Sequence, residues 1–160
     1  MIRTLPGPTE GIKQFRAAPW PFQSTFLTPM KNLSGFVGAL LARFVLEYGG
    51  LQTDIVVFEP LNLLELLSTR SIPVNDTWHF ILEAEGQVEI AELLEAALGD
   101  SVDFIFVPSP GSFAIYADHD EYTTVYASTD SELRNLVSGL QAAGFNCVTH
   151  YTRPSGDHWK

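Results

Sequence analysis

The stretch Asp118-His119-Asp120-Glu121 holds the densest group of side chains that could do chemistry. Carboxylates beside an imidazole could bind a divalent cation or share the transfer of a proton. A metal site, however, needs ligands that converge, and consecutive residues at a hairpin tip point in different directions. The alternating acids and glycine of a calcium-binding loop are also missing from the sequence. Because hairpin tips need polar, turn-tolerant residues, we interpret the stretch as a turn and keep a metal-dependent enzyme as the least favoured alternative.

The histidines and the one cysteine follow no catalytic or metal-binding pattern. Cys147 and His150 are three residues apart in a predicted strand, which places them on opposite faces. The segment 108–112 carries one glycine, and its prolines lack the amides that would hold an anion. No zinc-type spacing relates the four histidines, which are His79, His119, His150 and His158. We therefore expect no catalytic residue, no metal and no cofactor.

Tyrosines surround this predicted hairpin and suggest a binding surface. If the tip has three residues, His119–Glu121, then Asp118 lies opposite Tyr122, and alternate residues on both strands share one face. A two-residue tip would split that set. Tyrosine rings with carboxylates suit a protein interface, although rings that only cover the edge of the core remain an equal alternative. The predicted partner-binding residues are Tyr116, Asp118, Asp120, Glu121, Tyr122 and Tyr126.

Net charge restricts the class of partner. The 160-residue chain carries a formal charge of −10. The acids are concentrated after residue 50, where seventeen Asp and Glu face four Lys and Arg. Such a field repels phosphate backbones, so we expect no nucleic acid, and it attracts basic protein surfaces. A ridge of glutamates at helical spacing is either a solvated helix face or a second contact for a basic partner; it comprises Glu85, Glu89, Glu92 and Glu95.

The second half of the chain shows clear elements. From Trp78 onward the order is β-α-β-β-β-α-β, which predicts an α+β fold with a mixed, largely antiparallel sheet and helices on one face, a variation on the ferredoxin-like arrangement. Thr129 and Glu132 have the spacing of a capping box. The predicted strands are 78–84, 103–107, 113–118, 122–127 and 145–151, and the helices are 87–98 and the one that Thr129 begins and Gly144 ends.

The first half is less regular. Five prolines and several aromatic side chains in residues 1–31 predict an arm without regular structure that packs on the body or on a second subunit of a homodimer. An organelle transit segment is the alternative for this arm, since Glu10 is its one acid. Residues 32–160 are predicted to form a single domain. There we expect a helix over 32–48 ended by Gly49-Gly50, a strand over Asp54–Glu59 and a helix over Leu61–Thr69.

Three classes of function remain. The first is a non-catalytic interaction protein, such as an inhibitor or immunity-type protein, that binds a basic partner. The second is a small-molecule-sensing regulatory domain, and the third is an enzyme that uses the cluster 118–121. The lone Cys147 favours a reducing compartment, and we expect a cytoplasmic protein. The longest apolar run, 33–46, is too short to span a bilayer and contains Arg43, so no membrane is expected.

Overall fold

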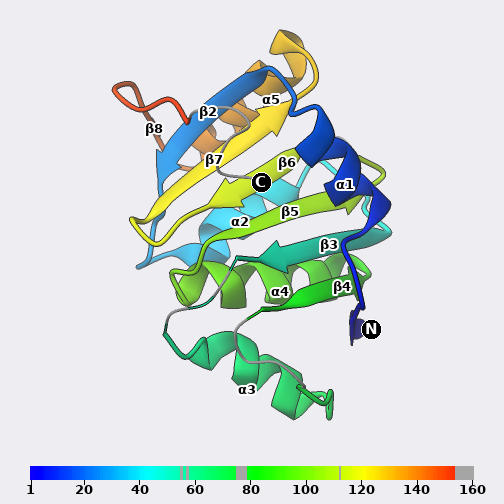
Figure 1. The fold of residues 1–160 in the computed structure, drawn as a ribbon. Coiled ribbons are helices and arrows are strands. Elements are labelled where there is room, and N and C mark those ends of the chain that lie inside the picture. The colour runs from blue at the N-terminus through cyan, green and yellow to red at the C-terminus, as the bar shows by residue number, and fades with distance from the viewer. Residues whose placement is uncertain (55, 57, 75–78, 112, 154–160) are drawn as a thin grey trace.

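A computed structural model gives the fold of the chain (Figure 1). It describes all residues except 55, 57, 75–78, 112 and 154–160. Within the described residues, eight strands form one antiparallel sheet in the order β1-β4-β3-β5-β6-β7-β2-β8. The strands are β1 (Ile2–Thr4), β2 (Phe22–Leu27), β3 (Tyr48–Thr53), β4 (Ile81–Glu85), β5 (Phe104–Ser109), β6 (Ala114–Ala117), β7 (Tyr122–Ala127) and β8 (Cys147–Val148). The helices are α1 (Glu10–Ala17), α2 (Leu33–Leu41), α3 (Leu61–Thr69), α4 (Gln87–Gly99) and α5 (Asp130–Ala142).

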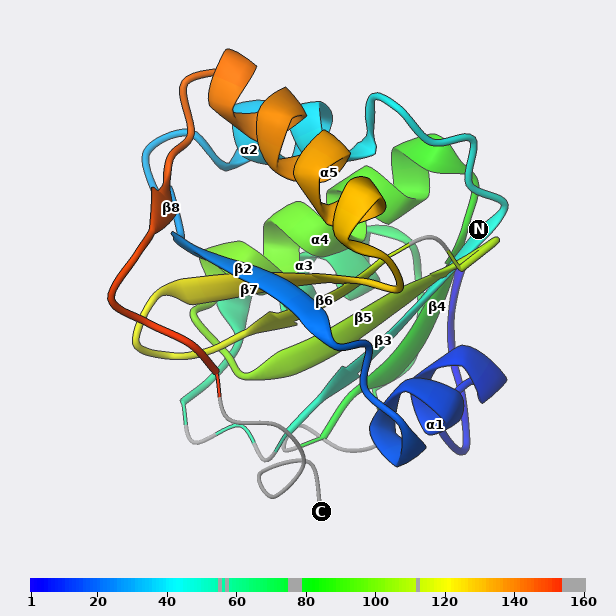
Figure 2. The same cartoon turned by 90° about the horizontal axis from the view of Figure 1, so that it is seen from above.

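The helices are divided unequally between the two faces of the sheet. Figure 2 shows α2, α4 and α5 on one face and α1 on the other, while α3 packs against α4. The predicted α+β class and the largely antiparallel sheet are confirmed. The ferredoxin-like detail is not confirmed, because two strands from the first half of the chain, β2 and β3, lie inside the sheet. Strand β3 separates β4 from β5, and β2 separates β7 from β8.

Strand alternation builds two hydrophobic layers. On the helical face, Leu51, Phe106 and Val125 join the main core, together with α2, α4 and α5. On the opposite face, Ile12 and Phe15 of α1 pack in a second cluster over the sheet. That cluster's sheet residues are Ile105, Val107, Ala114, Tyr116 and Tyr126. Because α1 is the one helix that the described residues place on this face, part of the face is left for polar groups.

The expectation of an irregular N-terminal arm is wrong. The segment supplies β1, α1 and β2, and β2 pairs along its whole length with β7. The hydroxyl of Thr9 caps α1 by accepting from the amide of Ile12 at 3.3 Å. Four of the five prolines fall between these elements and Pro29 follows β2, so none removes an amide donor from a helix or strand. Packing of the segment against the body of the same chain is confirmed by both strand pairings.

The predicted helix over 32–48 is too long. Asn32 caps α2, but the helix ends at Leu41, and Gly49-Gly50 lie inside the interior strand β3. A Cβ atom at Gly49 would overlap the ring of Phe106, and one at Gly50 would lie 2.6 Å from the Thr9 hydroxyl. These glycines therefore serve close packing on both faces of a strand. They do not terminate a helix.

Other boundaries differ in detail. The strand predicted over 54–59 is wrong for the described residues of that range, which lie outside any strand. The prediction that the next strand begins at Trp78 falls on a residue outside the described part; β4 begins at Ile81. The last strand is shorter than expected, since only Cys147 and Val148 pair with β2.

Several local predictions are confirmed. The bounds of α3 and β7 match those expected, and α4 differs by one residue. The hydroxyl of Thr129 accepts from the amide of Glu132 at 3.1 Å and caps α5. Helix α3 follows Pro60, which has no capping side chain. Its first amides donate instead to the carboxylate of Asp100, at 2.8 Å from both Asn62 and Leu63.

Candidate functional site

The hairpin between β6 and β7 has the three-residue tip on which the predicted surface depended. Ala117 pairs with Thr123, and the amide of Asp118 donates to the carbonyl of Tyr122 at 3.0 Å. The tip closes through Glu121, whose φ of 64° lies in the left-handed region. Asp118 and Tyr122 therefore face each other, and the expected register is confirmed.

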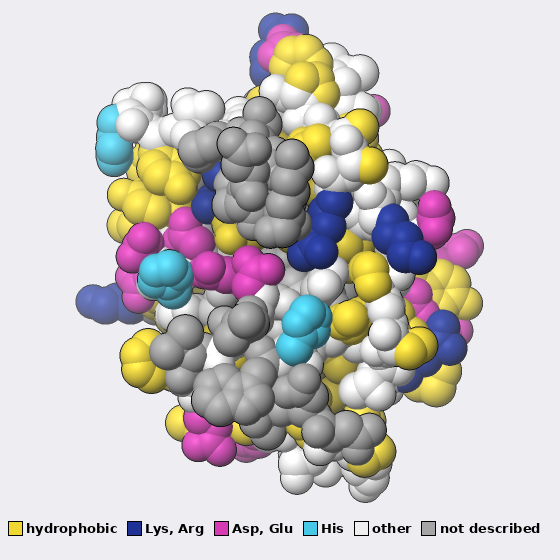
Figure 3. Space-filling model, in the orientation of Figure 1, with side chains coloured by type: hydrophobic (Ala, Val, Ile, Leu, Met, Phe, Trp, Pro, Cys, Tyr) yellow, Lys and Arg dark blue, Asp and Glu magenta, His cyan; other side chains and the backbone are white. Residues whose placement is uncertain are grey.

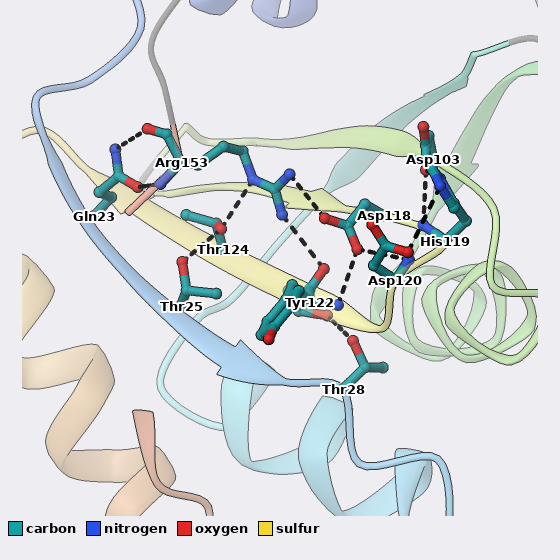
Figure 4. Close-up of polar contacts among 11 residues, drawn as sticks. Gln23, Thr25, Thr28, Asp103, Asp118, His119, Asp120, Tyr122, Thr124 and Arg153 are labelled. Atoms are coloured by element: carbon teal, nitrogen blue, oxygen red, sulfur yellow. Dashed lines mark hydrogen bonds and ion pairs between the residues drawn. The ribbon is translucent and has the colours of Figure 1, made fainter. Parts of the chain in front are cut away.

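The carboxylate of Asp118 holds this tip from inside. One oxygen, Oδ1, accepts from the amides of Asp120 and Tyr122, each at 3.0 Å. The other, Oδ2, accepts from Nη1 of Arg153 at 3.0 Å (Figure 4). Both side chains are almost fully buried, with 9% and 4% exposed. Since all of these contacts are internal, Asp118 is a structural residue of the hairpin.

Arg153 brings the end of the described chain onto the open face of the sheet. Its Nε donates to the hydroxyl of Thr124 at 3.0 Å, and its guanidinium lies 4.2 Å from the centre of the Tyr116 ring. Its backbone amide donates to the side chain of Gln23 at 2.9 Å, and its carbonyl accepts from the same side chain at 3.1 Å. These contacts join β2, β6 and β7 to the C-terminal segment through one residue.

A stacked pair of tyrosine rings makes a further contact between the hairpin and the C-terminal segment. The ring of Tyr151 lies parallel to that of Tyr122, with centroids 4.5 Å apart. The guanidinium of Arg153 lies 5.5 Å from the centre of the Tyr151 ring and so is close to two aromatic rings. Tyr122 is thus half-buried by its own chain and offers only part of its ring to a partner.

His119 and Asp103 form a second polar pair at the tip. The Asp103 carboxylate accepts from the backbone amide of His119 at 2.7 Å and lies 2.9 Å from its Nδ1. The hydrogen bond to Asp103 and its negative charge raise the pKa of His119 above its ordinary value, and Asp120 and Asp118 add to this. The imidazole itself is exposed to solvent.

Two of the predicted interface tyrosines are internal. Tyr116 and Tyr126 are 5% and 2% exposed and belong to the cluster under α1. The ring of Phe15 packs edge-on against Tyr126, with centroids 5.0 Å apart. Burial raises the pKa of both phenols, so they are neutral at physiological pH. The expectation that these rings are displayed to a partner is therefore wrong, and the alternative that rings cover the core applies to them.

The exposed remainder of the predicted set is small and acidic. The side chain of Asp120 is 73% exposed, and Glu121 is also exposed. Figure 3 shows acidic side chains gathered beside a histidine where the hairpin lies in Figure 1. Asp54, which lies 3.9 Å from Arg16, and Asp103 add negative charge near Tyr116. The tip is thus an acidic projection held by internal contacts.

The described residues contain no cluster of side chains arranged to bind a metal ion or to activate a cysteine. Their His, Cys, Asp and Glu side chains form no group of three or more that could hold a metal ion. Cys147 is half-buried in β8, and His150 lies beyond that strand. His79 is within 3.3 Å of the Gln52 side chain, and His158 lies outside the described residues.

Sequence reasoning missed the residues that support the hairpin, above all Arg153, Gln23 and Asp103. One signal was present for Arg153. After residue 50 the chain has four basic and seventeen acidic residues, so each basic residue has several carboxylates with which it could form an ion pair. A basic side chain that is buried needs such a partner. For Gln23 and Asp103 there was no local signal, because their partners are distant along the chain.

Comparison with known proteins gives no relative from which a function could be inferred. The chain matches no model of a protein family, no curated protein and no solved structure. Among the described residues, no helix has the length and apolar character needed to cross a membrane.

Proposed function

We propose that the chain is a non-catalytic interaction protein that binds a basic surface of a protein partner through the tip of the β6–β7 hairpin. The observation that carries this proposal is the anchoring of the tip by Asp118. Anchoring leaves the carboxylates of Asp120 and Glu121 outside, on a loop whose backbone is already ordered. A preorganised loop loses less conformational entropy on binding than a flexible one.

The charge of the whole chain supports the same partner class. A formal charge of −10 would accelerate association with a cationic protein and make it sensitive to salt. Inhibitors and immunity-type proteins that neutralise a basic toxin or nuclease are the kind of protein that this describes. We place it in the cytoplasm, because Cys147 is the only cysteine and reducing conditions would keep it free.

A capture experiment with paired variants tests the proposal. Immobilised wild-type protein is incubated with lysate of its source cells at low ionic strength, and retained proteins are quantified by mass spectrometry. The Asp120→Asn/Glu121→Gln variant removes two exposed charges at the tip, and the Glu10→Gln/Glu59→Gln variant removes two exposed charges elsewhere.

The result expected is one protein of high isoelectric point that wild type and control retain and that the tip variant loses. Retention should also fall as salt is raised. Equal losses from both variants would show that total charge acts instead of the hairpin, and an absence of any salt-sensitive basic protein would refute the proposal.

A further inference from the structure

A groove lies on the helical face between the end of α2 and the first turns of α4. It encloses about 700 Å³ and is lined mainly by apolar side chains, which include Phe44, Val45, Val88 and Ala91. Val45 is 91% exposed and Val88 is 65% exposed, although both are large apolar residues. Exposed apolar side chains that share one groove with a polar rim are a feature of binding sites.

Small residues make the groove accessible to a helix. Gly38 and Ala42 line it from the side of α2, and Ala91 lines it from α4. A Cβ atom added at Gly38 would meet no atom within 4 Å, so the space above this glycine is open. Small side chains at such positions let the backbone of a second helix approach closely, which helix-in-groove recognition requires.

The rim of the groove is acidic. Glu92 and Glu95, about one turn apart on α4, line it, and no Lys or Arg is among its lining residues in the described chain. Arg70 forms an ion pair with Glu92, whereas Glu95 has no ion pair among the described residues. A second hollow, between α3 and α4, is lined by the same two acids and by Glu65. The acids of α4 therefore stand between two hollows.

This charge decides between two occupants. A second copy of the chain, packed about a two-fold axis, would bring the same acidic rim against itself, and like charges in contact are unfavourable. A partner helix with Lys or Arg beside its apolar stripe would satisfy both the lining and the rim. We propose that the α2–α4 groove binds a basic amphipathic helix of a partner protein. The proposal does not depend on the hairpin, which projects from another part of the sheet.

The test uses a synthetic helical peptide of about 18 residues, roughly 27 Å long, with leucines on one stripe and lysines beside it. Its twin carries glutamate in place of each lysine. Binding to the full-length protein is measured by fluorescence anisotropy and located by amide chemical shifts. The basic peptide should bind saturably with shifts on α2 and α4, and the acidic twin should bind at least about tenfold more weakly.

Matched variants distinguish binding in the groove from nonspecific binding to exposed apolar residues. Val45→Ser/Val88→Ser should weaken binding of the basic peptide by about tenfold or more, because it removes exposed apolar area from the groove. The control Phe58→Ser/Leu61→Ser removes exposed apolar residues elsewhere, and Leu61 is 66% exposed, close to the fraction for Val88. The control should leave binding unchanged. Glu95→Gln should weaken binding of the basic peptide and should not weaken binding of the acidic peptide.

Three results would overturn the groove proposal. The first is equal binding of the two peptides, and the second is equal loss in the groove variant and its control. The third is a dimer in sedimentation experiments that Val45→Ser/Val88→Ser abolishes, which would make a second copy the occupant. The hairpin variant Asp120→Asn/Glu121→Gln should retain peptide binding. Loss of binding in that variant, with shifts at the tip, would count against the groove and leave the hairpin proposal standing.

Discussion

Asp118 and Arg153 form a buried ion pair that holds one member of the acidic cluster 118–121 inside the protein. The carboxylate accepts three hydrogen bonds inside the protein, from two backbone amides and one guanidinium. Taking both charges out of water is costly, and only the full set of partners offsets that cost. The pair therefore defines the geometry of the hairpin, and the neighbouring Asp120 and Glu121 are left to face solvent.

Removing Arg153 should destabilise the protein strongly. In Arg153→Ala the buried carboxylate of Asp118 loses its counter-charge, which typically costs about 3–5 kcal/mol. The free energy of unfolding in urea measures the loss. The control is Arg134→Ala, which breaks an exposed pair with Asp130 on α5 and should cost less than about 1 kcal/mol. Similar losses of unfolding free energy in the two variants would mean that the buried pair contributes no more to stability than the exposed pair.

The exposed histidine gives a pH-dependent prediction. Because Asp103 raises the pKa of His119, protonation of the imidazole stabilises the folded state. This contribution is fully present below the unfolded pKa of about 6.5 and is lost as pH rises through the raised folded pKa. An NMR titration should give His119 a pKa above the ordinary value of about 6.5, and Asp103→Asn should lower it. An unchanged pKa in that variant would contradict the assigned cause.

At the scale of elements, the glycine pair in β3 shows how one sequence pattern serves two structures. Two glycines after an apolar helical run usually end a helix, yet here they admit the Phe106 ring on one face and Thr9 on the other. Both contacts come from elements distant in sequence. The pattern alone could not distinguish the need for a turn from the need for space.

Gly49→Ala should destabilise the protein, since its Cβ would overlap the ring of Phe106 and force repacking beside an interior strand. Overpacking of this kind typically costs about 1–3 kcal/mol. Gly38→Ala in α2 is the matched control, because its Cβ meets open space, and it should stabilise the helix by roughly 0.5–1 kcal/mol. Thermal unfolding of both variants checks the sign of each change.

At the scale of the whole molecule, the N-terminal segment is part of the sheet. Strand β2 lies between β7 and β8, and its Phe26 is buried beside Phe36 of α2, with ring centroids 5.9 Å apart. The sheet therefore depends on residues that the sequence suggested were an accessory arm. Figure 2 shows α2 and α4 on one face of the sheet and the β6–β7 turn at the end of its strands, so the residues that line the α2–α4 groove lie apart from the hairpin tip.

Phe26→Ala should reduce the free energy of unfolding by about 3–5 kcal/mol, the usual cost of deleting a buried ring. Phe22→Ala in the same strand removes a ring that is already 36% exposed and should cost clearly less. Urea denaturation monitored by circular dichroism compares the two. If Phe26→Ala proved as mild as Phe22→Ala, the segment would contribute little to the core.

The sequence by itself determined what depends on neighbours along the chain. Helical spacing and the Thr129 cap located α5, the leucine run located α3, and turn-tolerant residues located the tip of the hairpin. Net charge determined the class of partner that we propose. Only the tertiary structure decided that β2 and β3 lie inside the sheet, that Tyr116 and Tyr126 are covered, and that Arg153 anchors Asp118. These facts depend on contacts between residues far apart in the chain. Such contacts produce no local pattern of residue types from which they could be predicted.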